Sequence, residues 1–195
     1  MLTVPPLESF GPRICVCGPS NAGKSTLTAA IAAHIGAEAI FLDILRHQPH
    51  TDWVMRPQSE FEAAHAEAIE TERWVIEGNY MSLLQQRVTR ATGIILLGTD
   101  RWTAFGRYLR RTLFEQERHG MLAGAQDSLK WDMINFILIE QPRKRQRDIA
   151  LLRATGLPMV QFDSMKELQA AYTAWGLNRK DLMAAGPRGL PLRSF

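Results

Sequence analysis

The chain has 195 residues, with few cysteines, few aromatic residues and little net charge. Its two cysteines, Cys15 and Cys17, are two positions apart in an apolar run, where a strand would point both side chains to the same face. A disulfide between them would be strained, and a metal site would need further soft ligands that the neighbouring sequence lacks. We therefore expect two buried core thiols, which is typical of a protein of the reducing cytoplasm.

Long apolar runs are also missing. No run approaches the roughly 20 residues needed to cross a bilayer, and the first residues lack the apolar segment of a secretory signal, so we expect no membrane association. The net charge of +3 does not by itself indicate nucleic-acid binding. The length fits one domain, expected at residues 1–175, with an irregular C-terminal tail at 176–195.

Apolar runs and helical patterns alternate along the rest of the chain. The pattern predicts five strands, at residues 13–17, 38–42, 73–78, 93–98 and 158–162. It predicts helices at about 24–35, 58–71, 99–120, 128–154 with an interruption at Pro142, and 164–176. This alternation is typical of an α/β fold in which helices cover both faces of a parallel sheet.

A glycine-rich segment, GPSNAGKST, follows the first strand and precedes the first helix. It matches the P-loop (Walker A) pattern G-x-x-x-x-G-K-[ST], whose backbone N–H groups and helix N-terminus bind phosphate. Lys24 would neutralise the β- and γ-phosphates of ATP, and Ser25 would bind Mg²⁺. The expected nucleotide-binding residues are Gly18, Pro19, Ser20, Asn21, Ala22, Gly23, Lys24, Ser25 and Thr26.

A small-GTPase function is disfavoured. No Asp of this chain is followed by Gly three positions later, as the switch motif of that class requires. The segment Asn178-Arg179-Lys180-Asp181 has the wrong order for a guanine-binding motif, and it follows the last helix instead of a core strand.

Two acidic residues end predicted strands, where open parallel sheets bind their ligands. Asp43 would face the crevice and bind or deprotonate an acceptor, unless it serves as a helix N-cap. Glu77 would hold Mg²⁺ or orient the attacking group. Asn79 and Tyr80 are expected to line the acceptor pocket, although Tyr80 fits a packing role equally well.

Arginines gather in the second half of the chain. Arg107, Arg110 and Arg111 share one face of a helix, and Arg118 is close to that face. Nearby in the chain, Pro142 is followed by the cations Arg143, Lys144, Arg145 and Arg147. The segment between the two clusters predicts a lid at about 112–130 that brings arginines onto a triphosphate; the alternative is a set of solvated helix faces. Arg46 and Arg56, which are near Asp43 in the sequence, could bind an anionic acceptor; the alternative is that both are solvated surface charges.

Over residues 13–172 the chain resembles the P-loop kinase-like proteins of the DNA topology modulation (FlaR-type) group, relatives of adenylate and shikimate kinases. The motifs that carry the resemblance are GPSNAGKST, FLD at 41–43, Trp53, RWVIEGNY at 73–80, RYLRR at 107–111 and PRKRQRDIALL at 142–152. Glu77 stands where that group usually has Asp. The lid segment at 120–124 lacks the arginine often found there.

The resemblance implies the fold of nucleoside-monophosphate kinases, which is a P-loop NTPase fold with strand order 2-3-1-4-5 and an arginine-bearing lid. It assigns Lys24 and Ser25 to ATP and Mg²⁺, and Asp43 to the acceptor. Arg107 and Arg111 would lie at the approach of the lid, with Arg143 or Arg147 near the nucleotide.

The sequence therefore predicts an ATP- and Mg²⁺-dependent phosphotransferase that acts on an unidentified small molecule or nucleotide. Two alternatives stay open: a nucleotide-dependent regulatory module acting on DNA topology, and an ATPase with water as acceptor. Binding to DNA phosphates would require a basic stripe away from the P-loop. The basic residues of this chain concentrate where a lid is expected, which favours the kinase.

Overall fold

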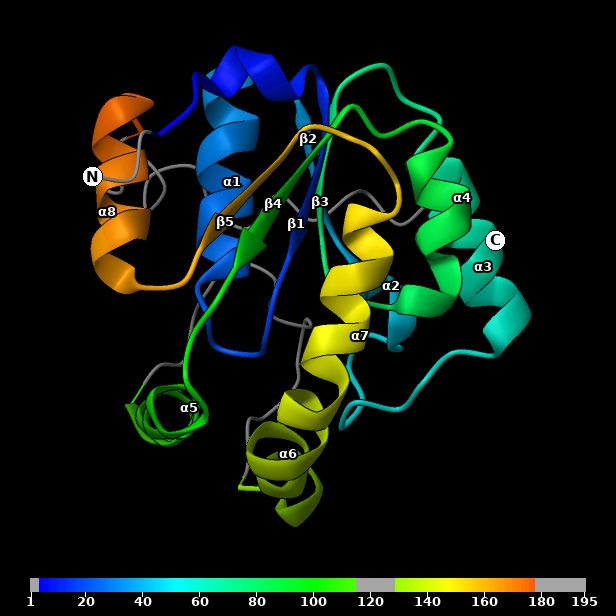
Figure 1. Ribbon diagram of the computed structural model, residues 1–195. Helices are drawn as coiled ribbons and strands as arrows, with labels where there is room; N and C mark the ends of the chain where they lie inside the picture. Colours follow the sequence, from blue (N-terminus) through cyan, green and yellow to red (C-terminus); the bar gives the residue numbers. More distant parts are fainter. Residues whose placement is uncertain (1–3, 115–128, 178–195) are drawn as a thin grey trace.

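A five-stranded, all-parallel sheet forms the centre of the computed structural model (Figure 1). The structure describes residues 4–114 and 129–177, and for Arg111 and Phe114 it describes the backbone alone. The strand order is β2-β3-β1-β4-β5, so the predicted order and parallel arrangement are confirmed. The strands are β1 (Arg13–Cys17), β2 (Glu38–Phe41), β3 (Trp74–Glu77), β4 (Gly93–Leu97) and β5 (Met159–Phe162).

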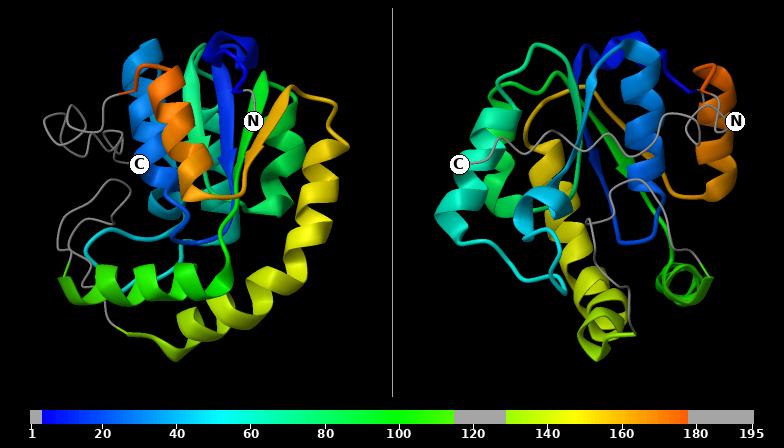
Figure 2. Two further views of the ribbon diagram at one scale, coloured as in Figure 1. Left: turned by 60° about the vertical axis from the view of Figure 1, so that its left-hand side comes forward. Right: turned by 180° about the vertical axis from the view of Figure 1, so that it is seen from behind.

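Helices cover both faces of the sheet (Figure 1). One face carries η1 (Leu7–Phe10), α1 (Lys24–Ile35) and α8 (Met165–Ala174). The other carries α2 (Leu42–Arg46), α3 (Gln58–Ala68), η2 (Met81–Leu83), α4 (Leu84–Val88) and α7 (Gln141–Arg153). Beyond the carboxyl ends of the strands lie α5 (Arg101–Phe114), α6 (Trp131–Asn135) and η3 (Phe136–Glu140), and Figure 2 shows α5 passing below the sheet.

Alternating side chains of the central strands separate two hydrophobic layers. Ile14 and Val16 of β1 belong to the layer under α1 and α8, whereas Cys15 and Cys17 belong to the layer under α3, α4 and α7. Both thiols are free and fully buried, as predicted. Near-continuous apolar strands are what a sheet covered on both faces requires, because each of its two faces must exclude water.

The bounds of several predicted elements need correction. The structure does not end a strand at Asp43: β2 ends at Phe41, and Asp43 lies in the first turn of α2, which lets Leu42 and Leu45 both be buried. Helix α3 ends at Ala68 instead of residue 71. Strand β1 has the predicted bounds, and the other four strands are one or two residues shorter than predicted. These differences concern the ends of the elements, where the bounds of helices and strands are least sharply defined.

Pro142 does not interrupt the helical run from α6 to α7. The run continues through the π-helical turn η3, and Pro142 occupies the first turn of α7. A proline has no N–H and its ring clashes with the carbonyl four residues earlier, so the wider turn before it accommodates a residue that a regular α-helix would not. The predicted lid falls mostly on residues 115–128, which lie outside the described residues, as do residues 178–195 of the predicted tail.

Across residues 4–114 and 129–177, no helix combines the length and apolar character needed to cross a membrane.

Candidate functional site

The loop from Gly18 to Gly23 joins β1 to α1, as the motif predicts. Gly18 has a φ of 139°, and a Cβ placed there would lie 2.4 Å from the carbonyl oxygen of Leu97. Gly23 is the N-cap residue of α1 and has a φ of 95°, so no side chain caps the first N–H groups of the helix. Both conformations favour glycine, and the close approach at Gly18 excludes any side chain. The loop therefore presents the N-terminus of a 12-residue helix, which favours an anion.

Lys24 and Ser25 begin α1 at the end of this loop. The Nζ of Lys24 donates a hydrogen bond of 2.9 Å to the carbonyl oxygen of Pro19, so the ammonium group lies over the loop instead of pointing into solvent. Thr26 is half-buried in the same helical turn, and Ala22, within the loop, is buried. The ammonium group thus lies where a polyphosphate in the loop would meet it.

Ser25 and Glu77 come together although 52 residues separate them in the chain. The Ser25 hydroxyl donates to Oε1 of Glu77 at 3.1 Å, and the Glu77 residue is only 3 % exposed. Glu77 ends β3, and its register partner Val16 lies on the strand that leads into the loop. A hydroxyl and a carboxylate are hard oxygen donors of the kind that Mg²⁺ takes in nucleotide sites.

No group of three or more His, Cys, Asp or Glu residues within the described part of the chain is placed to hold a metal. A cation between Ser25 and Glu77 would therefore complete its shell with water and substrate oxygens. This donor set fits Mg²⁺, which keeps several waters and is bound through one or two carboxylates plus phosphates.

Three side chains from separate elements hold the loop. Oδ1 of Asn79, which follows β3, accepts from the Gly18 N–H at 2.9 Å. The Nε2 of Gln141 donates to Oγ of Ser20 at 3.0 Å, and Arg107 of α5 donates to the carbonyl of Asn21 at 3.1 Å. Arg107 thus contacts the loop directly. Sequence reasoning missed Gln141, because nothing near residue 141 marks it as a partner of a loop 121 residues away.

The other predicted arginines differ in whether the structure describes them and in whether they lie near the loop. The side chain of Arg111 and all of Arg118 lie outside what the structure describes. Arg147 lines a cavity beside the loop and lies 3.4 Å from a carboxylate oxygen of its neighbour Asp148. Arg143 is exposed on α7 and does not line that cavity. Of the two arginines predicted to lie near the nucleotide, only Arg147 therefore shares a cavity with loop residues.

Asp43 contacts Tyr80 at the carboxyl edge of the sheet. The Tyr80 hydroxyl donates to Oδ1 of Asp43 at 2.7 Å, and the tyrosine ring packs edge-on against Phe61 of α3, 5.0 Å between centroids. Burial, followed by the charge of Asp43 and the hydrogen bond to it, raises the pKa of Tyr80, so the phenol remains a donor. Arg46 lies over the Phe61 ring at 5.2 Å and donates to the carbonyl of Arg56.

A buried arginine that sequence reasoning missed supports this region. Arg87 of α4 has no exposed surface, and its guanidinium group donates to the carbonyl oxygens of Gly78, Asn79 and Tyr80. Tyr80 has a φ of 26°, which is unusual for a residue with a side chain. Arg87 therefore stabilises the segment after β3 in a conformation that places Asn79 at the loop and Tyr80 at Asp43.

A cavity of about 400 Å³ opens beside the loop, between the end of β4 and the helices η3 and α7. Gly18 and Pro19 border it on the loop side. Its apolar wall includes Leu96, Ile137 and Leu152, each at most 6 % exposed. This size is within the range of small-molecule sites.

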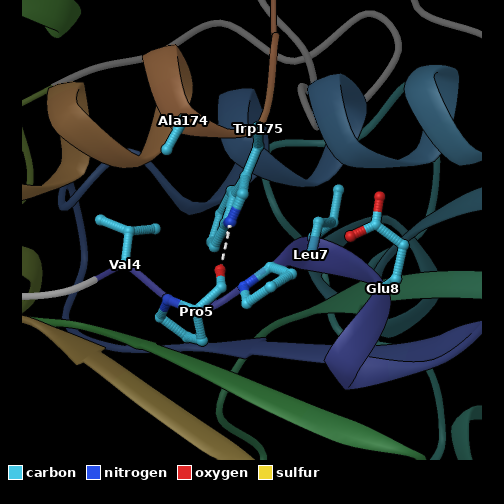
Figure 3. Close-up of a pocket in the computed structure, with 7 residues that line it drawn as sticks. Val4, Pro5, Leu7, Glu8, Ala174 and Trp175 are labelled. Carbon is cyan, nitrogen blue, oxygen red and sulfur yellow. Dashed lines mark hydrogen bonds between the residues drawn. The ribbon is translucent and has the colours of Figure 1, made fainter.

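A second, smaller hollow of about 260 Å³ lies between the N-terminal segment and α8 (Figure 3). The Trp175 indole N–H donates to the carbonyl of Pro5 there, at 2.8 Å. This hollow contains none of the predicted site residues.

No protein-family model matches the chain, and a search of curated proteins gave no match either.

Proposed function

We propose that the protein is an ATP- and Mg²⁺-dependent phosphotransferase built on a P-loop NTPase fold of the nucleoside-monophosphate-kinase type. The contact between Ser25 and Glu77 carries the proposal, because it joins the hydroxyl of the Walker A motif to a buried strand-end carboxylate. The sheet order and the resemblance to the FlaR-type group support the same assignment.

Each residue has a part in the proposed reaction. The loop residues 18–23 and the N-terminus of α1 would bind the phosphates, and Lys24 would neutralise the β- and γ-phosphates. Mg²⁺ held by Ser25 and Glu77 would offset phosphate charge. An acceptor oxygen would bond to the γ-phosphorus, the bond to the bridging oxygen would break, and ADP would leave. Asp43 is the candidate to take the acceptor proton, and Arg107 the candidate to stabilise the charge.

The test is a measurement of Mg–ATP binding by calorimetry together with ADP production across a panel of hydroxylated and phosphorylated small molecules. We expect Lys24→Ala and Glu77→Gln to lower acceptor-dependent ADP production by at least 100-fold, as loss of preorganised charge stabilisation typically does. Lys166→Ala is the matched control, because Lys166 is exposed on α8, in a helix that carries no predicted site residue.

Failure of the unmodified protein to bind Mg–ATP would refute the proposal. ADP production that Lys24→Ala abolishes but no acceptor increases would instead indicate an ATPase with water as acceptor. A steep salt dependence of duplex DNA binding, with no acceptor found, would favour the regulatory module.

A further inference from the structure

We infer that the cavity between β4 and α7 binds the phosphate acceptor, and that this acceptor is a small anionic compound with an apolar, ring-sized body. The inference rests on the proposed phosphotransferase function and names the substrate class of that site. It is carried by where the cavity lies and by what lines it.

The position of the cavity relative to the loop distinguishes an acceptor from a nucleotide base. The Lys24 ammonium group, which in a P-loop contacts the β- and γ-phosphates, lies 2.9 Å from the carbonyl of Pro19. Pro19 itself lines the cavity. The cavity therefore meets the loop at the end where the terminal phosphates would lie, and an acceptor must approach there, whereas the base lies at the opposite end of a triphosphate.

The segment after β3 supports the same position. Asn79 and Met81 line the cavity, two and four residues beyond the metal-ligand candidate Glu77. Tyr80, between them, turns to the other side and contacts Asp43. A molecule in the cavity would thus border the segment that directly follows Glu77.

The wall of the cavity is mostly apolar. Leu96 at the end of β4, Ala104 of α5, and Ile137 of η3 are buried, with 6 %, 1 % and 1 % exposure, and half-buried Phe136 and Ile149 extend the same surface. Such a wall gains free energy by covering an apolar ring or chain and loses it by covering a polar sugar. The body of the acceptor is therefore apolar.

The rim of the cavity is cationic. Arg101, Lys144, Arg145 and Arg147 line it, against the acids Asp100 and Asp148. The Asp100 carboxylate already accepts from the N–H groups of Trp102 and Thr103 at the start of α5.

The ion pairs at the rim are exposed. Arg145 pairs with Asp163 and Lys144 with Glu140, with all four side chains at least 42 % exposed. Exposed pairs contribute little, so a guanidinium or ammonium group here can exchange its partner for an acid group of the ligand.

Two fluorescent probes test the site: 1-anilinonaphthalene-8-sulfonate, which is an apolar ring system with one acid group, and N-phenyl-1-naphthylamine, which lacks the acid. We expect the sulfonate probe to bind the full-length protein with a stoichiometry of about one. Ile149→Trp fills the cavity and should weaken that binding about tenfold or more. Leu151→Trp is the matched control on the same helix, because Leu151 is 43 % exposed and does not line the cavity; it should leave the affinity unchanged.

Two further measurements vary the charge of the rim and add the nucleotide. Lys144→Gln should weaken the sulfonate probe about threefold and leave the neutral probe unaffected, as expected for one exposed cation. Saturating Mg–ATP should bind alongside the probe. In the acceptor screen, Ile149→Trp should raise the KM of the acceptor and leave the KM of ATP unchanged.

Equal effects of Ile149→Trp and Leu151→Trp, or no probe binding at all, would overturn the inference. So would strict competition between Mg–ATP and the probe, which would give the cavity to the nucleotide base. Failure of the proposed function looks different: Mg–ATP would not bind to the unmodified protein, whatever the probe does.

Discussion

Lowering the pH from about 7 to about 5 should destabilise the protein through His65. This residue of α3 has no exposed surface, its Nδ1 lies 2.9 Å from Oε1 of Gln86, and its buried Nε2 has no hydrogen-bond partner among the described residues. Burial lowers the pKa of His65 from 6.5 to about 4, against a raising effect of the Gln86 hydrogen bond and with a further lowering by the charge of Arg87.

The sign and size follow from proton linkage. Between the two pKa values the unfolded chain binds a proton that the folded chain does not, so the stability is fully present above about pH 6.5 and decreases as the pH falls towards 4. At about pH 5 the expected loss is roughly 2 kcal/mol, and below pH 4 it levels off at about 3 kcal/mol.

Urea unfolding followed by tryptophan fluorescence measures this loss. With a slope of about 2 kcal/mol per molar urea, the midpoint of the parent should fall by about 1 M more than that of His65→Gln over the same pH interval, because other titrating groups cancel in the comparison. Titration of the His65 ring by NMR in the folded parent tests the same point without a substitution. Equal pH slopes for parent and variant, or a folded-state pKa near 6.5, would refute the reasoning.

Two further predictions concern the site. Gly18→Ala should destabilise the protein by about 2 kcal/mol or more in urea unfolding, because its Cβ would meet the Leu97 carbonyl, whereas Gly36→Ala, with open space around it, should cost only about 1 kcal/mol; equal losses would contradict the steric argument. Asp43→Asn and Tyr80→Phe should each slow phosphoryl transfer to the acceptor, and the double variant should be no slower than the worse single variant, because the two side chains act through one hydrogen bond. Fully additive losses would show that they act independently.

Local patterns in the sequence were enough to predict the parallel sheet, the glycine-rich loop and the place of Glu77. The apolar runs of β1 and β4 are buried on both faces, so their composition alone identifies them as central strands. The motif around Lys24 predicts a loop between a strand and a helix, because its glycines permit backbone angles that other residues rarely adopt. Glu77 could be placed opposite Ser25 because strand ends meet at one edge of a parallel sheet.

Other features depend on contacts that no local pattern encodes. Arg87 resembles any solvated helix arginine in the sequence, and its burial follows from three carbonyl groups brought together by the turn after β3. Gln141, at the start of α7, contacts Ser20 although 121 residues separate them in the chain. Asp43 lies in a helix and not at the end of a strand, because a helical turn at this point lets both Leu42 and Leu45 be buried.

The three side chains that hold the loop have a thermodynamic consequence. Asn79, Gln141 and Arg107 fix Gly18, Ser20 and Asn21 independently of any ligand. The backbone entropy of these residues, about 1–2 kcal/mol each when a chain segment becomes ordered, is therefore lost on folding and not on binding. Association with a polyphosphate would then leave the backbone order of the loop unchanged, so the heat capacity change of binding should reflect only the surface that ligand and protein bury against each other, and stay small.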